Sequence, residues 1–281
     1  MRPNQDVVNQ WSKSAQFWEK HREVIRGMFE PVTQALIQDA EISVGQTILD
    51  IATGPGEPAL SLAEVVGPAG KVCGIDPSPG MIEGARRAAA SLQTKNIQFD
   101  VAFADQLPFA AGTFDAVVCR FGAMFFPAPG DAIREILRVL KPGGKFALAV
   151  WHVAENNPFH HSLSRVLDRH VPLPPPEPDA LDAFRFAALG KLLKFVNEAG
   201  AHGACERLLQ SNIAAPITAE DFWAVRMEMS TSLRDKIAAL SGDQLKAVTQ
   251  ELVEALREYS TVDGLSFPAE VLIVSGTKPA N

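Results

Sequence analysis

The chain has 281 residues, of which 47% are hydrophobic, and a formal net charge of −7. This length allows one large domain or a domain with a sizeable insertion, and the apolar content is sufficient for a core. The negative charge excludes a broad surface for polyanions, because nucleic-acid binders usually carry a basic stripe. Cys73, Cys119 and Cys205 are odd in number and widely spaced, so we expect inert thiols rather than disulfides or a metal site.

The N-terminal residues do not resemble an export signal. Residues 1–6 lead into a polar, aromatic segment rather than the apolar core of a signal peptide. No run in the chain approaches the ~20 apolar residues that a membrane span requires. We therefore expect a cytoplasmic protein without a membrane span.

Residues 6–40 carry apolar side chains at roughly helical spacing. The pattern is interrupted near Gly27 and Pro31, which predicts two or three amphipathic helices before the first strand. Most of these apolar residues are expected to pack against a sheet.

Residues 47–59 combine an apolar run, one acid and two glycines. The run predicts a buried strand that delivers a ligand-binding loop. Gly54 and Gly56 allow a positive φ and the close approach of a ligand, which a Cβ would block. Pro58 fits the first turn of a following helix, whose free N–H groups would face the ligand.

The same loop also fits other interpretations. Gly54-x-Gly56-x-x-Ala59, with Asp76 about 20 residues further on, satisfies a dinucleotide-binding fingerprint. The glycines could also form only a tight turn. Asp50 at the strand end favours a third interpretation, because its carboxylate would repel a pyrophosphate but attract an ammonium group. The loop therefore suits a nucleoside that carries an amino acid.

Strand and helix patterns alternate through the first half of the chain. We expect strands at 71–75, 97–103, 114–119 and 145–152, and helices at 58–66, 78–92 and 131–140. This alternation predicts an α/β fold with a parallel, doubly wound sheet. Asp76 follows the second strand, where its carboxylate could accept both ribose hydroxyls. Its alternative role as a helix cap can be filled by Ser78.

Four segments now resemble the class I S-adenosylmethionine-dependent methyltransferases, in particular the ubiquinone/menaquinone biosynthesis C-methyltransferases. The resemblance covers residues 45–152 and is looser outside them. The four segments are Leu49-Asp50-Ile51-Ala52-Thr53-Gly54-Pro55-Gly56, Gly74-Ile75-Asp76-Pro77-Ser78, Ala104-Asp105-Gln106-Leu107-Pro108-Phe109 and Arg138-Val139-Leu140-Lys141-Pro142-Gly143-Gly144.

The resemblance implies a Rossmann-like, seven-stranded sheet whose last strand is antiparallel. It implies S-adenosyl-L-methionine as cofactor and S-adenosyl-L-homocysteine as product. The implied cofactor-binding residues are Asp50, Ala52, Thr53, Gly54, Gly56, Asp76, Pro77, Met81, Ala104, Asp105, Gln106, Arg120, Phe121 and Trp18. Three parts are expected: an N-terminal helical cap (1–44), the cofactor-binding core (45–152), and a region that completes the sheet with helical lid insertions at about 153–185 and 214–265 (153–281).

One position departs from the family pattern. Phe103 stands where relatives often have Asp or Asn near the adenine amino group. Either Asp105 substitutes for that residue, or the backbone around Ala104 and Asp105 binds the adenine while Phe103 packs on the ring.

The second half of the chain has a looser pattern. The proline run at 172–178 is read as a stiff surface connector rather than a ligand for a proline-reading domain. We expect a helix at 186–199, a strand at 204–213, helices at 219–229, 233–240 and 244–259, and a final strand at 269–276. With the N-terminal helices, the inserted helices should form a lid over the carboxyl edge of the sheet.

Methyl transfer needs alignment of acceptor, methyl carbon and sulfur, and the exclusion of water. A general base helps some acceptors, and His is the usual choice near neutral pH. His152 at the end of the fifth strand is the candidate, although a structural role is an alternative for it, as for His160, His161 and His21. No metal site is expected.

The leading hypothesis is a methyltransferase that acts on a small, apolar or aromatic molecule by direct in-line transfer, to O or to C. The alternatives are a catalytically silent S-adenosylmethionine-binding module and a nicotinamide-dependent oxidoreductase. Asp50 and the segments at 107–109 and 141–144 disfavour the oxidoreductase. A small-molecule acceptor, and no nucleic acid, is the expected partner.

Overall fold

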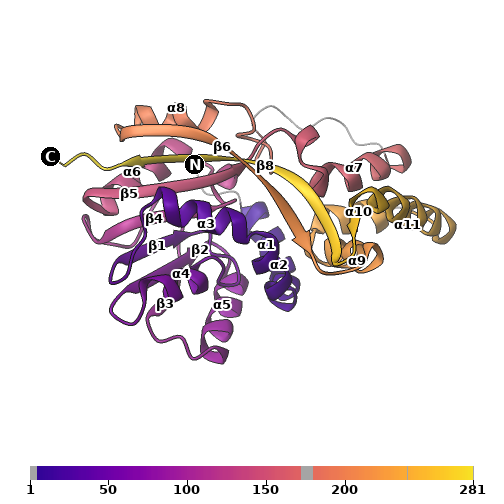
Figure 1. Ribbon diagram of the computed structural model, residues 1–281, viewed down its shortest axis with the longest axis horizontal. Coiled ribbons are helices and arrows are strands. Elements are labelled where there is room, and N and C mark those ends of the chain that lie inside the picture. The colour runs from indigo at the N-terminus through magenta and orange to yellow at the C-terminus, as the bar shows by residue number, and fades with distance from the viewer. Residues whose placement is uncertain (1–4, 172–179, 239, 281) are drawn as a thin grey trace.

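The computed structural model describes residues 5–171, 180–238 and 240–280. Within these ranges, one sheet has the strand order β3-β2-β1-β4-β5-β8-β6, with β7 paired to β8 off this path (Figure 1). The strands are β1 (Thr47–Ile51), β2 (Lys71–Asp76), β3 (Ile97–Val101), β4 (Phe114–Arg120), β5 (Leu140–Trp151), β6 (His202–Ala215), β7 (Ser260–Thr261) and β8 (Gly264–Thr277).

The first five strands are parallel, and β8 is antiparallel to both of its long neighbours, β5 and β6. The central strands are apolar on both faces because helices cover both; four of the five residues of β1 are buried. The Rossmann-like fold expected from the sequence is confirmed. The strand order reverses between β1 and β4, which is where such sheets bind ligands.

The antiparallel part of the sheet is longer than the sequence predicts. β8 begins at Gly264 and pairs with β6 as far as Ala215, and β7 was not predicted. The extension is stable because its inward side chains, Ile213, Leu265 and Phe267, are buried. In Figure 1 these two strands run past β5 toward α9 and α10.

Helices pack against both faces of the sheet. They are α3 (Glu30–Asp39), α4 (Ala59–Val66), α5 (Pro79–Ser91), α6 (Pro129–Val139) and α8 (Lys191–Glu198). Ser78 caps α5 as predicted, since its Oγ accepts the Met81 N–H at 3.3 Å. Pro58 is the N-cap of α4 rather than a residue of its first turn, so that prediction is wrong by one position. α8 starts only at Lys191 because Gly190, with φ +78°, precedes it.

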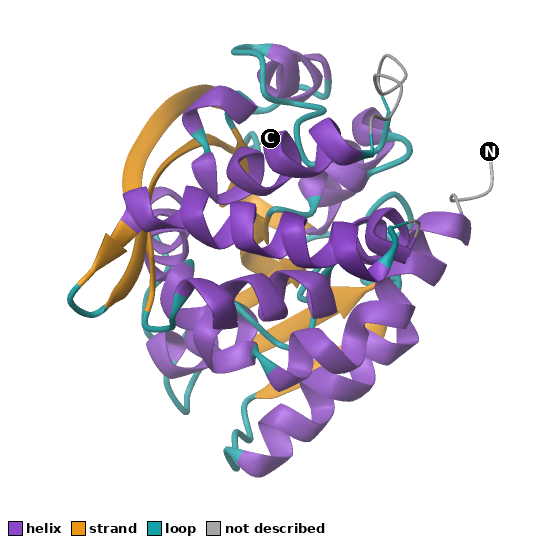
Figure 2. Cartoon of the chain, turned by 90° about the vertical axis from the view of Figure 1, so that its right-hand side faces the viewer, coloured by secondary structure: helices purple, strands orange, loops and turns teal. Residues whose placement is uncertain are grey.

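The remaining long helices lie beyond the sheet. α1 (Gln5–Lys20) and α2 (Arg22–Met28) precede α3, which makes three helices in the N-terminal segment. α7 (Pro158–His170), α9 (Ala219–Met229), α10 (Thr231–Ala238) and α11 (Gly242–Leu256) follow the core strands. Seen from the side that carries them, helices cover much of the sheet behind (Figure 2). The proline run at 172–178 lies outside the described residues.

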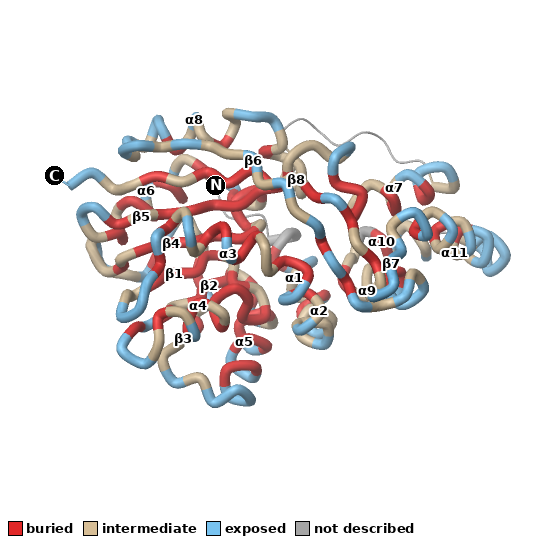
Figure 3. Tube along the Cα trace, viewed as in Figure 1, coloured by how far each residue is buried: buried red, intermediate tan, exposed pale blue. Residues whose placement is uncertain are grey.

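The buried residues concentrate along the central strands and on the helix faces that contact them (Figure 3). Short 3-10 turns at Ala123–Phe125, Ala154–Asn156 and Arg257–Tyr259 connect elements. Within the part of the chain that the structure describes, no helix has the length and apolar character needed to cross a membrane.

Candidate active site

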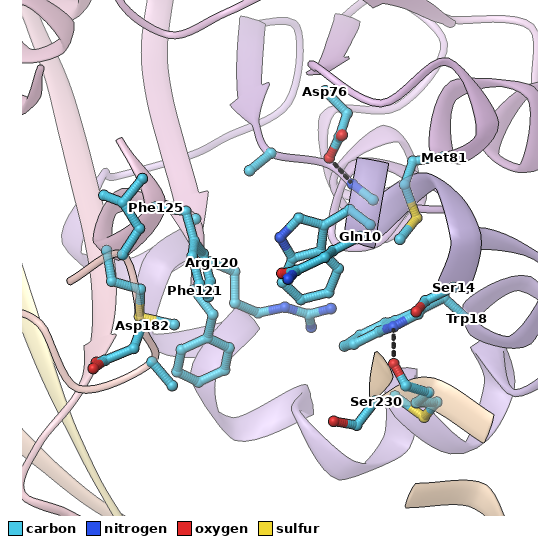
Figure 4. A pocket seen from close by; sticks show the side chains of 18 of the residues that line it. Gln10, Ser14, Trp18, Asp76, Met81, Arg120, Phe121, Phe125, Asp182 and Ser230 are labelled. Carbon is cyan, nitrogen blue, oxygen red and sulfur yellow. Dashed lines mark hydrogen bonds between the residues drawn. The ribbon is translucent and has the colours of Figure 1, made fainter. Parts of the chain in front are cut away.

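One cavity of about 650 Å³ lies at the carboxyl ends of the parallel strands. Its wall includes residues that directly follow β1, β2, β3 and β4, together with Trp151, the last residue of β5. Helices α1, α7, α9 and α10 contribute the opposite wall. In Figure 4, Asp76 and Met81 lie on one side, Phe125 and Asp182 on the other, and the Arg120 guanidinium between them.

The loop after β1 has an unusual backbone conformation. Ala52, Gly54 and Gly56 all have positive φ, at 59°, 55° and 107°. A Cβ on Gly54 would meet no atom within 4 Å, so this glycine leaves open space toward the cavity. A Cβ on Gly56 would instead lie 3.1 Å from Leu60, and Gly56 does not line the cavity. A side chain at Gly56 would therefore crowd Leu60 of α4, and the positive φ favours glycine there.

Asp76 is held in place by two backbone amides. Its Oδ2 accepts the Gly54 N–H at 3.1 Å, the bond marked at Asp76 in Figure 4, and its Oδ1 accepts the Ser78 N–H at 2.9 Å. A carboxylate has about four acceptor positions, so lone pairs remain for a ligand. Burial raises the pKa of Asp76 to about 6. Pro77 and Met81 line the cavity beside it.

Asp50 and Thr53 lie behind the loop, outside the cavity wall. Both carboxylate oxygens of Asp50 and the hydroxyl of Thr53 are buried and accept or donate no hydrogen bond to a described residue. Burial raises the pKa of Asp50 to about 7. These polar atoms are costly unless a ligand or its waters reach them.

Arg120, at the end of β4, is buried and lines the cavity. It donates to Thr33 Oγ1 at 2.7 Å and to the Glu57 carbonyl oxygen at 3.2 Å. Burial lowers its pKa, while the carboxylates of Glu57 and Asp50 raise it. These contacts fix the guanidinium at the centre of the site.

Aromatic rings form the far part of the cavity. Phe121, with φ +60°, stacks on Trp151 with centroids 4.2 Å apart and planes 4° apart. Phe159 stacks on the other side of the same cluster, 6.1 Å from Trp151. Phe29 contacts all three rings edge-on. This part of the cavity is therefore a flat, apolar chamber that suits a ring system.

The helices over the cavity are fastened to one another. Trp18 Nε1 on α1 donates to the Met229 carbonyl oxygen at the end of α9, at 3.3 Å. Glu228 accepts from Lys20 at 2.8 Å and lies 2.6 Å from His21 Nε2. We call this group of contacts between α1 and α9 the clasp.

The adenine-side loop is only partly in the wall. Phe103, Ala104 and Asp105 line the cavity, whereas Gln106 does not. The backbone of Gln106 instead pairs with Phe103 in an isolated bridge. The structure therefore brings together most of the predicted residues, but leaves Asp50, Thr53, Gly56 and Gln106 outside the cavity wall.

His152 also lies outside the cavity wall. Its ring Nδ1 is 2.8 Å from Glu270 Oε2, and its backbone N–H donates to the Glu270 carbonyl oxygen. His160 lines the cavity, eight residues further along the chain. The sequence also does not single out Arg226 of α9, which lines the same chamber. One signal was present, because Arg226 shares a helix face with Phe222 (i−4) and Met229 (i+3).

The hydrogen-bond acceptors and the open space of the site suit the predicted cofactor. Asp76 retains free acceptor positions, Gly54 has no Cβ to obstruct a ligand, and the buried side-chain oxygens of Asp50 and Thr53 have no well-formed hydrogen bond in the described chain. Aromatic rings suited to a sulfonium cation stand close by, among them Trp18 and Phe121.

Comparisons with known proteins agree with this geometry. Residues 48–144 match the family described as "Methyltransferase domain". A demethylmenaquinone methyltransferase of Symbiobacterium thermophilum is 40% identical over 146 residues, which cover 51% of this chain and 53% of that protein. A ubiquinone/menaquinone biosynthesis C-methyltransferase of Pseudomonas fluorescens is 34% identical over 145 residues, covering 51% and 55%. The chain thus spans about half the length of these curated relatives.

Among solved structures, the YcgJ protein from Bacillus subtilis superposes with a TM-score of 0.58 and 20% identity, covering 89% of this chain and 98% of that one. The chain therefore has the fold of this structure, and residues 48–144 resemble a methyltransferase domain. Over about half of its length, the chain is similar to methyltransferases named for quinone biosynthesis.

Proposed function

We propose that the protein transfers a methyl group from S-adenosylmethionine to a small, apolar or aromatic molecule. The observation that carries this proposal is a single cavity with two different ends. One end has the Gly54 loop and the spare acceptor positions of Asp76; the other has the aromatic chamber around Trp151. A donor and an acceptor could meet between them in line.

Each end has a separate task in this proposal. Asp76 accepts hydrogen bonds from the ribose hydroxyls, with Ala52, Pro77, Met81, Ala104 and Asp105 around the nucleoside. Asp50, Thr53, Gly56 and Gln106 support the loops from behind. Trp18, Arg120 and Phe121 surround the amino-acid part, where a ring face would attract the sulfonium by about 0.5–2 kcal/mol. The cofactor itself supplies an activated methyl group when bound.

The helices outside the core serve as a cover in this proposal. Residues 1–44 and the inserted helices after residue 153 exclude water from the reacting atoms. The clasp between α1 and α9 supports this role, because it joins the N-terminal cap to the lid.

The aromatic lining supports an acceptor with rings. Relatives of the core are described as acting on demethylmenaquinone, and one as an aklanonic acid methyltransferase. The site leaves transfer to O or to C open. The proposal assigns no base to His152, because its Nδ1 contacts Glu270 and its side chain does not line the cavity.

The silent cofactor-binding module and the nicotinamide enzyme are not favoured by the methyltransferase relatives. A cytoplasmic location and the absence of a nucleic-acid partner stay outside the proposal as untested predictions.

The test uses S-adenosylmethionine that carries a radioactive methyl group. The protein is incubated with it and with a panel of quinols, phenols and aromatic acids. We expect label in at least one acceptor, with an equal amount of S-adenosylhomocysteine formed. Cofactor binding without transfer to any panel member would favour the silent module instead.

A further inference from the structure

Arg226 projects from α9 into the aromatic chamber. Its guanidinium lies over the Phe159 ring, 4.3 Å from the ring centroid. Its Nε is buried, and the guanidinium forms no hydrogen bond or ion pair with any described residue. A cation in an apolar chamber is costly when nothing pairs with it.

The other cations in the cavity wall differ from Arg226. Arg22 pairs with Glu23 at 2.8 Å, and Lys236 pairs with Asp168 at 2.9 Å. Arg120 donates to a hydroxyl and a carbonyl, as described above. Among the cavity-lining residues that the structure describes, Arg226 is therefore the cation that lacks an oxygen partner.

Three of the four acids that line the cavity have partners elsewhere, and the fourth, Asp105, forms no ion pair with Arg226. Asp182 accepts the Phe184 N–H at 2.7 Å, and Glu57 accepts the Ser61 hydroxyl at 2.8 Å. Asp76 is held by the amides of the glycine loop. Burial lowers the pKa of Arg226 to about 10, so the side chain still carries its charge at neutral pH.

His160 stands beside this cation. Its ring contacts those of Trp151, Phe159 and Phe184 edge-on, with centroids 4.6, 5.0 and 5.3 Å away. Its Nε2 is buried without a hydrogen-bond partner in the described chain. Burial and the charge of Arg226 lower the pKa of His160 well below its ordinary value, so the imidazole is neutral and can donate one hydrogen bond.

We propose that Arg226 and His160 form an oxyanion-binding end of the acceptor site, so that the preferred acceptor is an aromatic molecule with an acidic oxygen substituent, in the simplest case a carboxylate. A guanidinium above an apolar ring plane offers several N–H donors to such a group. The neutral imidazole adds a donor without repelling the arginine. This inference rests on the proposed function and names the acceptor class for the same cavity.

The test compares two probes of nearly the same shape, 2-naphthoate and 2-naphthamide. Their binding to the wild-type protein is measured by calorimetry at pH 7.5, with S-adenosylhomocysteine at saturation. We expect the carboxylate to bind at least about tenfold more tightly than the amide, since hydrogen bonds to charged groups are the stronger ones. The Arg226→Gln variant should lose this preference, and His160→Phe should weaken it.

Arg257→Gln serves as the matched control. Arg257 belongs to the same insertion, is exposed, and pairs with Glu254 at 2.6 Å. The Arg257→Gln substitution removes the same charge without touching the chamber, so the preference for naphthoate over naphthamide should remain. Circular dichroism and the melting temperature establish that each variant is folded.

Three results with the two probes would overturn the inference: equal binding of both to the wild type, an unchanged preference in Arg226→Gln, or an equal loss of preference in Arg257→Gln. The affinity for S-adenosylhomocysteine is measured separately in each variant. Its loss in Arg226→Gln would show that Arg226 holds the cofactor carboxylate instead, and would also overturn the inference. Failure of the wild type to bind S-adenosylhomocysteine would count against the proposed function, whatever the naphthoate result.

Discussion

Asp76 combines features that seldom occur together in one carboxylate. It is buried, it accepts two backbone amides, and it lines a cavity. Burial outweighs the two hydrogen bonds and raises its pKa to about 6. Because the folded-state pKa lies above the unfolded one, the contribution of Asp76 to stability is fully present below about pH 4 and is lost as the pH rises through 6.

A bound ribose should reverse this preference, because its hydroxyls donate to the ionised form. We therefore predict that the affinity for S-adenosylhomocysteine rises between pH 5 and pH 7, by at most about tenfold per pH unit below the pKa. Calorimetric titrations across this range measure the effect. In Asp76→Asn the step near pH 6 should be absent, whereas Asp100→Asn, which alters a half-buried acid on β3 outside the cavity wall, should retain it. A flat wild-type profile would contradict the ribose role.

The residues of the glycine loop could be predicted from the sequence because their roles are local. Gly54 and Asp76 follow adjacent parallel strands, so their meeting is implied by the strand pattern. Arg226 and His160 could not be found in this way. These two side chains stand out because their buried nitrogens have no hydrogen-bond partner in the described chain. That property depends on how α7 and α9 pack, which the sequence does not show. His152 was selected for its place at a strand end, but the structure turns it toward Glu270.

At the scale of elements, the clasp connects two segments about 200 residues apart. Lys20 and His21 end α1 or directly follow it, and Glu228 lies in the last turn of α9. Hydrogen bonds from Lys20 and His21 lower the pKa of Glu228. Because the acid is partly exposed, the clasp should contribute little to global stability, about 0.2–1 kcal/mol at most. Its effect should be on how often the lid opens.

We predict that Glu228→Ala leaves the melting temperature nearly unchanged but speeds the release of S-adenosylhomocysteine several-fold. Without Glu228, fewer contacts between α1 and α9 have to break before the lid opens, so the lid opens more often. Stopped-flow displacement measures the release rate. Glu254→Ala removes an exposed acid of α11 and is the control. Equal release rates in wild type and Glu228→Ala would argue against a lid that opens at this contact.

Sequence patterns predicted where single helices begin and end, but they did not predict how the elements are arranged. α9 spans Ala219–Met229, the range expected from the sequence, and the Thr218 side chain caps it by accepting the Asp221 N–H. The extent of β6 and β8 was underestimated, because their added residues are stabilised by burial against distant segments rather than by local alternation. No periodicity in the sequence could reveal that α1 and α9 meet.

At the scale of the whole molecule, the sheet forms one side of the cavity and the helices cover the other side. The parallel core presents the carboxyl ends of its strands to the cavity, and helices from both ends of the chain cover it (Figures 1 and 2). The sequence predicted this plan through the alternation of strands and helices. The cavity joins the two halves, so a ligand in it should stabilise the folded chain as a unit.

The most direct measurement is calorimetric and thermal titration with S-adenosylmethionine, S-adenosylhomocysteine and NAD(P)H in parallel. At about 100 times its dissociation constant, a ligand adds ~2.7 kcal/mol to stability, which corresponds to roughly 5 °C in a protein of this size. We expect this shift from the two adenosyl compounds alone, and a loss of affinity of about tenfold or more in Asp76→Ala. Preferential binding of the nicotinamide, or no binding of either adenosyl compound to the folded wild-type protein, would contradict the account.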